Sequence, residues 1–112
     1  MALDPNDAAK RVLICYRQLN ELLKDIAGTK ARARLESYNH ILETLKECSA
    51  LDLAFADAVR HLQPIQPEGL AAGEAHLKLG ADGAVLLATA HSFIELYLSP
   101  EEKKKTMGFH TS

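Results

Sequence analysis

One segment of the chain carries carboxylate and imidazole side chains at regular spacing. Its members are Glu36, His40, Glu43 and Glu47. Steps of four and three residues place side chains on one face of an α-helix, where such groups can bind a divalent metal ion. The same strip lies opposite an apolar stripe, where an amphipathic helix carries its solvated charges, and the chain lacks the paired Glu-x-x-His motifs of di-iron bundles. We therefore expect a solvated charged face here, with neither a metal nor another cofactor.

A second candidate is a histidine in the segment Ala75-His76-Leu77-Lys78-Leu79-Gly80. This segment resembles the phospho-accepting segment of histidine phosphotransfer domains, which are small helical bundles. Gly80 lies at the family's distance from His76, whereas Lys78 comes one residue early. The resemblance implies that a solvated imidazole attacks a phospho-aspartate while Lys78 steadies the phosphoryl oxygens. An ordinary surface histidine accounts for the same residues.

A third candidate is the pair Arg34 and His40, six residues apart. The spacing is similar to that of the small helical ribonucleases and antitoxin partners called HEPN domains. The resemblance implies that two such segments meet across a dimer and cleave RNA without a metal. Leu35 stands where that family has a polar residue, and the net charge of −2 disfavours a nucleic-acid partner, since phosphate binding favours a basic excess.

Two apolar stripes predict the helices that position these residues. Their spacing of threes and fours is that of one helical face. The first helix is expected from Pro5, after an Asp4 cap, to about Ala27, and the second from Thr29 or Lys30. Gly28 separates them, so the two are expected to fold back on each other. The stripes are Val12, Tyr16, Leu19, Leu23, Ile26 and Leu35, Tyr38, Ile41, Leu42, Leu45.

The second stripe stops at Ser49, and a new stripe begins in shifted phase at Leu51. Residues 49–52 fit a capping box with Asp52 in the place of the usual glutamate. The pattern predicts a break near Ser49 and a third helix that ends before Pro64. A continuous bent helix is the alternative.

The region after Pro64 contains prolines and glycines that indicate further breaks. We expect a short helix over residues 68–79, closed by Gly80, although a hairpin of residues 76–79 with 84–87 is also compatible. Asp82 is expected to cap a last helix over residues 84–98. Residues 99–112 have little periodicity and are expected to form a flexible tail.

Together these elements predict an all-α fold, an antiparallel bundle of four to five helices in a single domain over residues 1–112. Apolar residues make up 47% of the chain, with no tryptophan and only six other aromatic residues, as is typical of bundles built on leucine and alanine. The last predicted helix is apolar almost all round, with Thr89, Ser92 and Glu95 as a narrow polar strip. Such a helix needs covering on most sides, which favours a central position or a homodimer.

Composition also bears on location and role. The uncharged stretch from Gly83 to Ile94 is too short to span a bilayer, and no signal-peptide pattern is present, so we expect a cytoplasmic protein without a membrane partner. Cys15 and Cys48 are expected to be reduced core residues. We expect a non-enzymatic protein-interaction or regulatory role, with contacts at the edges of the last helix and along residues 64–83.

Overall fold

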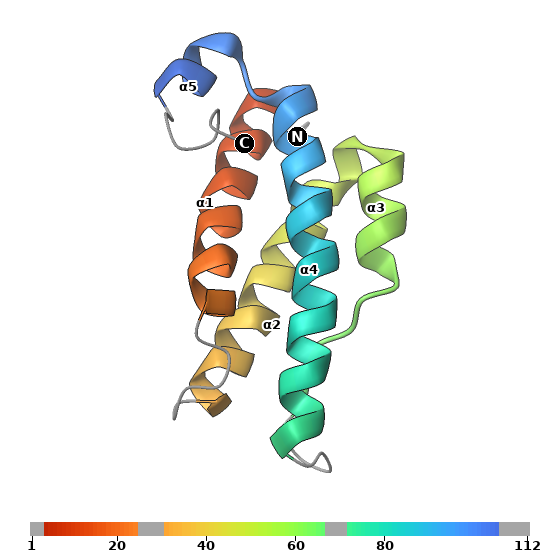
Figure 1. Cartoon of the computed structure of the whole chain (residues 1–112). Helices are drawn as coiled ribbons and strands as arrows, with labels where there is room; N and C mark the ends of the chain where they lie inside the picture. The colour runs from red at the N-terminus through yellow and green to blue at the C-terminus, as the bar shows by residue number, and fades with distance from the viewer. Residues whose placement is uncertain (1–3, 25–30, 67–71, 106–112) are drawn as a thin grey trace.

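The computed structural model describes residues 4–24, 31–66 and 72–105, and every regular element within these ranges is helical. The predicted all-α class is therefore confirmed for the part of the chain described (Figure 1). Gly28, which was expected to separate the first two helices, lies outside it. The helices are α1 (Pro5–Lys24), α2 (Ala31–Cys48), α3 (Leu53–Arg60), α4 (Ala72–Tyr97) and α5 (Pro100–Lys105), with a 3-10 turn η1 (Ser49–Leu51) between α2 and α3.

The start of α1 follows its sequence signals. The backbone N–H of Asp7 donates to Asp4 Oδ2 over 3.1 Å, so Asp4 caps the helix as predicted. Pro5 occupies the first helical position, where its missing N–H costs nothing. Val12 and Leu19 from the predicted stripe are fully buried, which aims this face of α1 at the core.

The break after α2 is confirmed, but its capping residue was predicted wrongly. The chain continues through η1, and the backbone becomes extended only at Asp52, with φ −143° and ψ 120°. Asp52 Oδ1 accepts the backbone N–H of Phe55 over 2.9 Å and caps α3. The Ser49 hydroxyl donates instead to the Lys46 carbonyl, which lies in the preceding helix. Ser49 therefore closes α2 and does not open α3.

The region from Ala72 to Tyr97 is one continuous helix, so the predicted short helix closed by Gly80 and the alternative hairpin are both wrong. Asp82 lies inside this helix and is not a cap. Glycine costs about 1 kcal/mol in a helix interior relative to alanine, but burial of a helical face outweighs propensity of that size. Leu79 and Leu86, on either side of the glycines, are almost fully buried.

Gly83 has a packing role that the sequence did not reveal. A Cβ atom at this position would lie 2.8 Å from Cδ2 and 3.3 Å from Cγ of Leu23 on α1. Only a residue without a side chain lets α1 approach α4 this closely. The glycine interpreted as a turn signal is therefore a contact between two helices.

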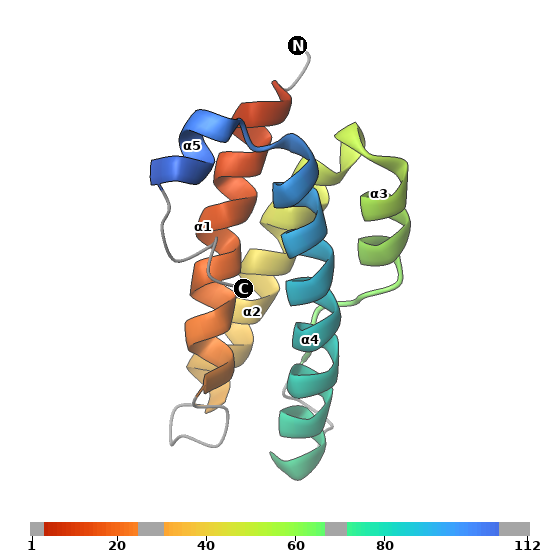
Figure 2. The same cartoon turned by 45° about the horizontal axis from the view of Figure 1, so that its top comes forward.

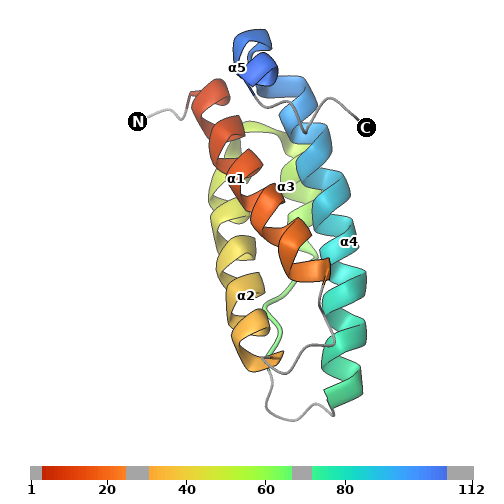
Figure 3. The same cartoon turned by 60° about the vertical axis from the view of Figure 1, so that its left-hand side comes forward.

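α4 was expected to be covered on most sides, but within one chain it is covered only in part and keeps apolar side chains exposed. It packs against α1, α2 and α3, and α1 also packs against α2. Figure 3 shows α1 lying across the space between α2 and α4. The largest fully buried side chains come from α1, α2, α3, α4 and the loop after α3, and they include Leu19, Tyr38, Val59, Ile65 and Phe93.

Part of the expected flexible tail is helical. α5 folds back over the start of α1 (Figure 2). The Ser99 backbone N–H donates to Asn6 Oδ1 over 2.8 Å, and Lys10 Nζ lies 3.5 Å from Glu102 Oε1. These long-range contacts hold residues 99–105 against α1, which local periodicity cannot reveal. The remaining residues of the predicted tail, 106–112, lie outside the described part.

The glycines of α4 provide a matched test of this packing. Gly73→Ala should raise the free energy of unfolding by about 0.5 kcal/mol, because no atom lies within 4 Å of the new methyl group and the unfolded chain loses freedom. Gly83→Ala should lower it by about 1 kcal/mol, because the methyl group must displace Leu23. Urea denaturation followed by circular dichroism measures both. Equal stabilisation by the two substitutions would show that α1 and α4 are not in close contact at Gly83.

Candidate functional site

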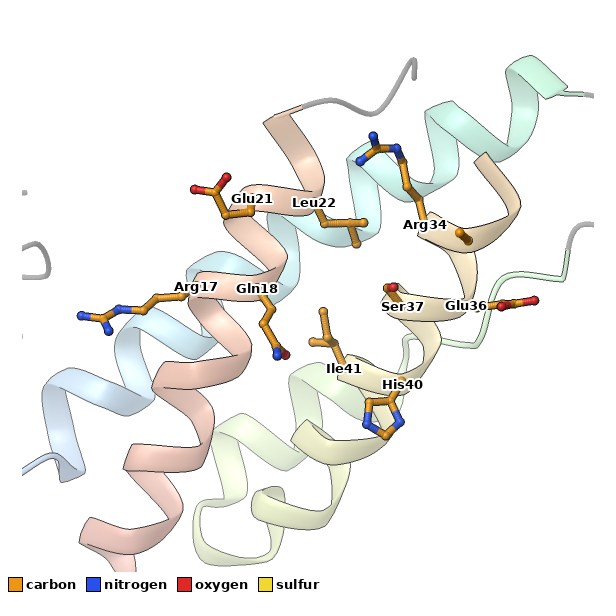
Figure 4. Close-up of a pocket in the computed structure, with 10 residues that line it drawn as sticks. Arg17, Gln18, Glu21, Leu22, Arg34, Glu36, Ser37, His40 and Ile41 are labelled. Atoms are coloured by element: carbon orange, nitrogen blue, oxygen red, sulfur yellow. The ribbon is translucent and has the colours of Figure 1, made fainter. Parts of the chain in front are cut away.

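An open groove of about 870 Å³ lies between α1 and α2. Arg34 and His40, the pair singled out by spacing, both line it. Gln18, Leu22 and Ile41 point into the space between the helices, whereas the charged groups of Arg17 and Glu21 point away from it (Figure 4). The groove therefore has an apolar floor and a polar rim. Its lining is Arg17, Gln18, Glu21, Leu22, Ala33, Arg34, Glu36, Ser37, His40 and Ile41.

His40 occupies a junction on this surface. It also lines two smaller hollows, of about 420 and 250 Å³, on the flanks of α2. The side chain is exposed, as a group acting on a ligand would have to be. Sequence reasoning found Arg34 and His40 but missed Gln18 and Ser37, because no periodic pattern distinguishes a groove-facing polar residue from a solvated one.

The carboxylate and imidazole side chains singled out on α2 do not share one environment. Glu36, His40 and Glu43 line the 420 Å³ hollow, but Glu47 Oε2 accepts a hydrogen bond of 2.9 Å from Arg11 Nη2 on α1. Among the residues that the structure describes, no group of three His, Cys, Asp or Glu side chains is arranged to hold a metal ion. The strip thus includes an interhelical ion pair, which places Glu47 beside α1.

His76 lies in the first part of α4, where its side chain is half-buried. Its Nε2 atom is buried and has no hydrogen-bond partner. Lys78 Nζ is 3.9 Å from Asp82 Oδ2, one helical turn further on. Phosphotransfer requires a solvated imidazole with a cation beside it. The burial of Nε2 and the engagement of Lys78 both disfavour that use of this segment.

Tyr38 is the largest fully buried side chain of the core, and its hydroxyl has no hydrogen-bond partner. Burial raises the pKa of the phenol above its ordinary value, and the negative charge of Asp82 on α4 adds to this effect. The side chain was predicted correctly as a core residue. An unpaired buried hydroxyl is destabilising, so it makes Tyr38 a sensitive probe of this region.

A second polar contact joins α3 to the end of α4. Tyr97 donates a hydrogen bond of 2.5 Å to Asp52 Oδ2. This bond, followed by the one from the Phe55 backbone, lowers the pKa of the Asp52 carboxyl. The rings of Phe55, Phe93 and Tyr97 pack in sequence with centroids 4.7 Å apart. Beside this cluster lies a hollow of about 190 Å³, which includes Ala54, Ala58 and Leu96 in its lining.

Both cysteines are free and buried, in agreement with their predicted place in the core. Burial, with a smaller effect from the nearby Cys48, raises the pKa of the Cys15 thiol to about 11. Burial also raises the pKa of Cys48. A thiol that is neutral at physiological pH is a poor nucleophile. The two residues therefore serve packing.

The exposed side of α4 is apolar over most of its length. Leu77 and Leu96 retain 77% and 70% of their exposure, and Val85 retains 46%. Between Leu79 and Ile94 no exposed residue of this helix carries a charge. Figure 1 looks onto α4 from a side that no other described helix covers. We call the following six exposed residues the α4 face: Leu77, Ala81, Val85, Ala88, Ser92 and Leu96.

Comparison with known proteins does not add a family to this description: no family model, curated protein or solved structure matches the chain. None of the described helices combines the length and the apolar character needed to cross a membrane. The candidate surfaces are therefore the α1–α2 groove and the α4 face, each defined by its own side chains.

Two tyrosines give opposite expectations for loss of a hydroxyl group. Tyr38→Phe should raise the free energy of unfolding by about 1 kcal/mol, because it removes a buried donor that lacks a partner. Tyr97→Phe should lower it, because it removes the bond to Asp52. Urea titrations of the two variants measure both effects. Loss of stability in Tyr38→Phe would show that this hydroxyl has a partner such as an internal water.

Proposed function

We propose that this chain is a non-enzymatic protein-interaction or regulatory module of the cytoplasm, an antiparallel helical bundle that acts as a homodimer. The observation that carries the proposal is the uncharged exposed side of α4, bordered by Leu77 and Leu96. A single exposed leucine is ordinary on a monomer, but a contiguous apolar face marks an interaction site.

The contrast with the other long helices supports this proposal. The exposed positions of α1 and α2 are mostly charged or polar, as expected of a solvated surface. Those of the middle of α4 are alanine, valine and serine. Leu53 at the start of α3 adds another exposed apolar side chain, with 88% of its exposure retained. The charged exposed residues of α1 and α2 include Lys10, Arg11, Arg17, Glu21, Lys24, Glu36, Glu43 and Glu47.

The groups singled out for possible chemistry also support a structural role. Glu47 is paired with Arg11, and Lys78 with Asp82. The Cys15 thiol has its pKa raised to about 11 and is held in the neutral form. Each of these side chains stabilises a helix or its packing, so their presence is explained without catalysis.

Sedimentation velocity over about 1 to 100 μM tests the homodimer, since useful affinities between small domains fall in or below this range. We expect a dimer, and Leu96→Asp should shift it to monomer because a carboxylate would be desolvated at the contact. Ile14→Asp is the matched control, since Ile14 is also exposed but lies on α1. A wild-type protein that stays monomeric throughout would contradict the proposed self-association.

One observation favours a second candidate function, RNA cleavage of the HEPN kind. Arg34 and His40 line the same groove, so one substrate could contact both side chains. In that family an arginine and a histidine act without a metal, and the same roles would fall to these two residues. The exposed His40 at the junction of three hollows fits a group that reaches a bound phosphodiester.

Incubation of the purified protein with single-stranded RNA in the presence of a metal chelator tests this alternative. If it holds, the RNA is cut, and Arg34→Ala and His40→Ala each abolish cutting. His61→Ala should leave it unchanged, because His61 is exposed at the end of α3, away from the groove residues. Intact RNA after incubation with the wild-type protein would end the hypothesis.

A further inference from the structure

We infer that the occupant of the α4 face is the α4 face of a second copy of this chain, in antiparallel alignment about a two-fold axis level with Leu86 and Leu87. The inference rests on the proposed homodimer and specifies its geometry. A two-fold dimer uses one surface twice, so each contact residue must find a suitable partner when the helix direction is reversed.

The spacing of the α4 face meets this requirement. Its six residues follow one another at intervals of 4, 4, 3, 4 and 4, a series that is the same in both directions. Reversing the helix about the centre therefore places Leu77 opposite Leu96, Ala81 opposite Ser92, and Val85 opposite Ala88. Small side chains occupy the middle, which lets two helices approach closely, and leucines occupy both ends.

The charges that border the face are complementary under the same alignment. Lys78 and Glu95 are equally distant from the centre, so the reversed helix places each near its opposite in the partner. Their side chains are 48% and 50% exposed, although each also lies near an opposite charge of its own chain, Lys78 near Asp82 and Glu95 near Lys103. A parallel arrangement would place like charges together at both ends. Charge thus selects the antiparallel second copy over the parallel one.

A hollow is also available for Leu77 of the second copy. Leu96 lines the 190 Å³ hollow between α3 and α4, together with Ala54, Phe55 and Phe93. Because the alignment brings Leu77 of the second copy to Leu96, that side chain arrives beside this hollow, whose lining also includes Asp52, Thr89 and Ser92. The symmetry repeats this contact at the other end. Leu77, the most exposed apolar residue of α4, is thereby buried in the dimer.

Engineered cysteine pairs test the alignment. Val85→Cys with Ala88→Cys should give a disulfide-linked dimer under oxidation, because these positions face each other across the axis. Ala81→Cys with Ala84→Cys is the matched control: both sites are exposed at the same spacing, but in the partner they lie about 12 Å out of register. The native thiols are buried and do not interfere. Non-reducing electrophoresis measures the covalent dimer, and linkage of both pairs alike would overturn the antiparallel alignment.

Charge reversal gives a second test. Lys78→Glu and Glu95→Lys should each raise the dissociation constant of the dimer about tenfold, since two symmetric pairs are changed at once. The double variant should return to within about twofold of the wild type. Within one chain the two residues lie about 26 Å apart along the helix, so rescue must come from contact between subunits.

The homodimer and the α4 alignment are contradicted by different results. A wild-type dimer that is unaffected by these substitutions, and not linked by the Val85 and Ala88 cysteines, would overturn the α4 alignment while leaving the homodimer in place. A wild-type monomer at every concentration would remove both. Linkage of the first pair with rescue in the charge double variant would establish the α4 face as the dimer contact.

Discussion

The burial of α4 is the constraint on which the rest of this structure depends. This helix spans residues Ala72–Tyr97 and packs against three others, so each neighbouring helix is placed by the side of α4 that it covers. At Gly83 the approach is close, because Leu23 of α1 occupies the space that a side chain would need. A helix with two glycines in its middle is weak by itself and is stabilised by what it packs against.

Polar contacts then fix the elements that apolar packing leaves free to slide. Asn39 forms two hydrogen bonds with the backbone of Ile65, donating to its carbonyl and accepting its N–H, and so ties the loop after α3 to α2. Asp52 caps α3 and also binds Tyr97 at the far end of α4. The Asn39–Ile65 and Asp52–Tyr97 bonds join residues 26 and 45 positions apart in sequence. Directional bonds of this kind specify register, whereas burial alone does not.

The two candidate surfaces differ in chemistry because they border different helices. The groove between α1 and α2 is rimmed by charges of both signs over an apolar floor. The α4 face has no charge between its bordering residues, Lys78 and Glu95. Water hydrates the charged rim of the groove well and the apolar α4 face poorly, so burying the α4 face against another surface is more favourable. This difference underlies the proposal that self-association uses α4 while the groove stays open to a ligand.

The sequence by itself determined the all-α class, the Asp4 cap of α1, the apolar stripes of α1 and α2, and the break near Ser49. Those features depend on local periodicity and on side chains within one turn of each other. Only the tertiary structure decided three other features. It placed Gly80 and Asp82 inside a helix and not at its end, it made Asp52 and not Ser49 the cap of α3, and it packed α5 on α1. Partners distant in sequence lie at or beside these positions: Leu23 packs at Gly83, Tyr97 binds Asp52, and Asn6 binds Ser99. Such contacts follow from three-dimensional packing, which the pattern along a single helix does not encode.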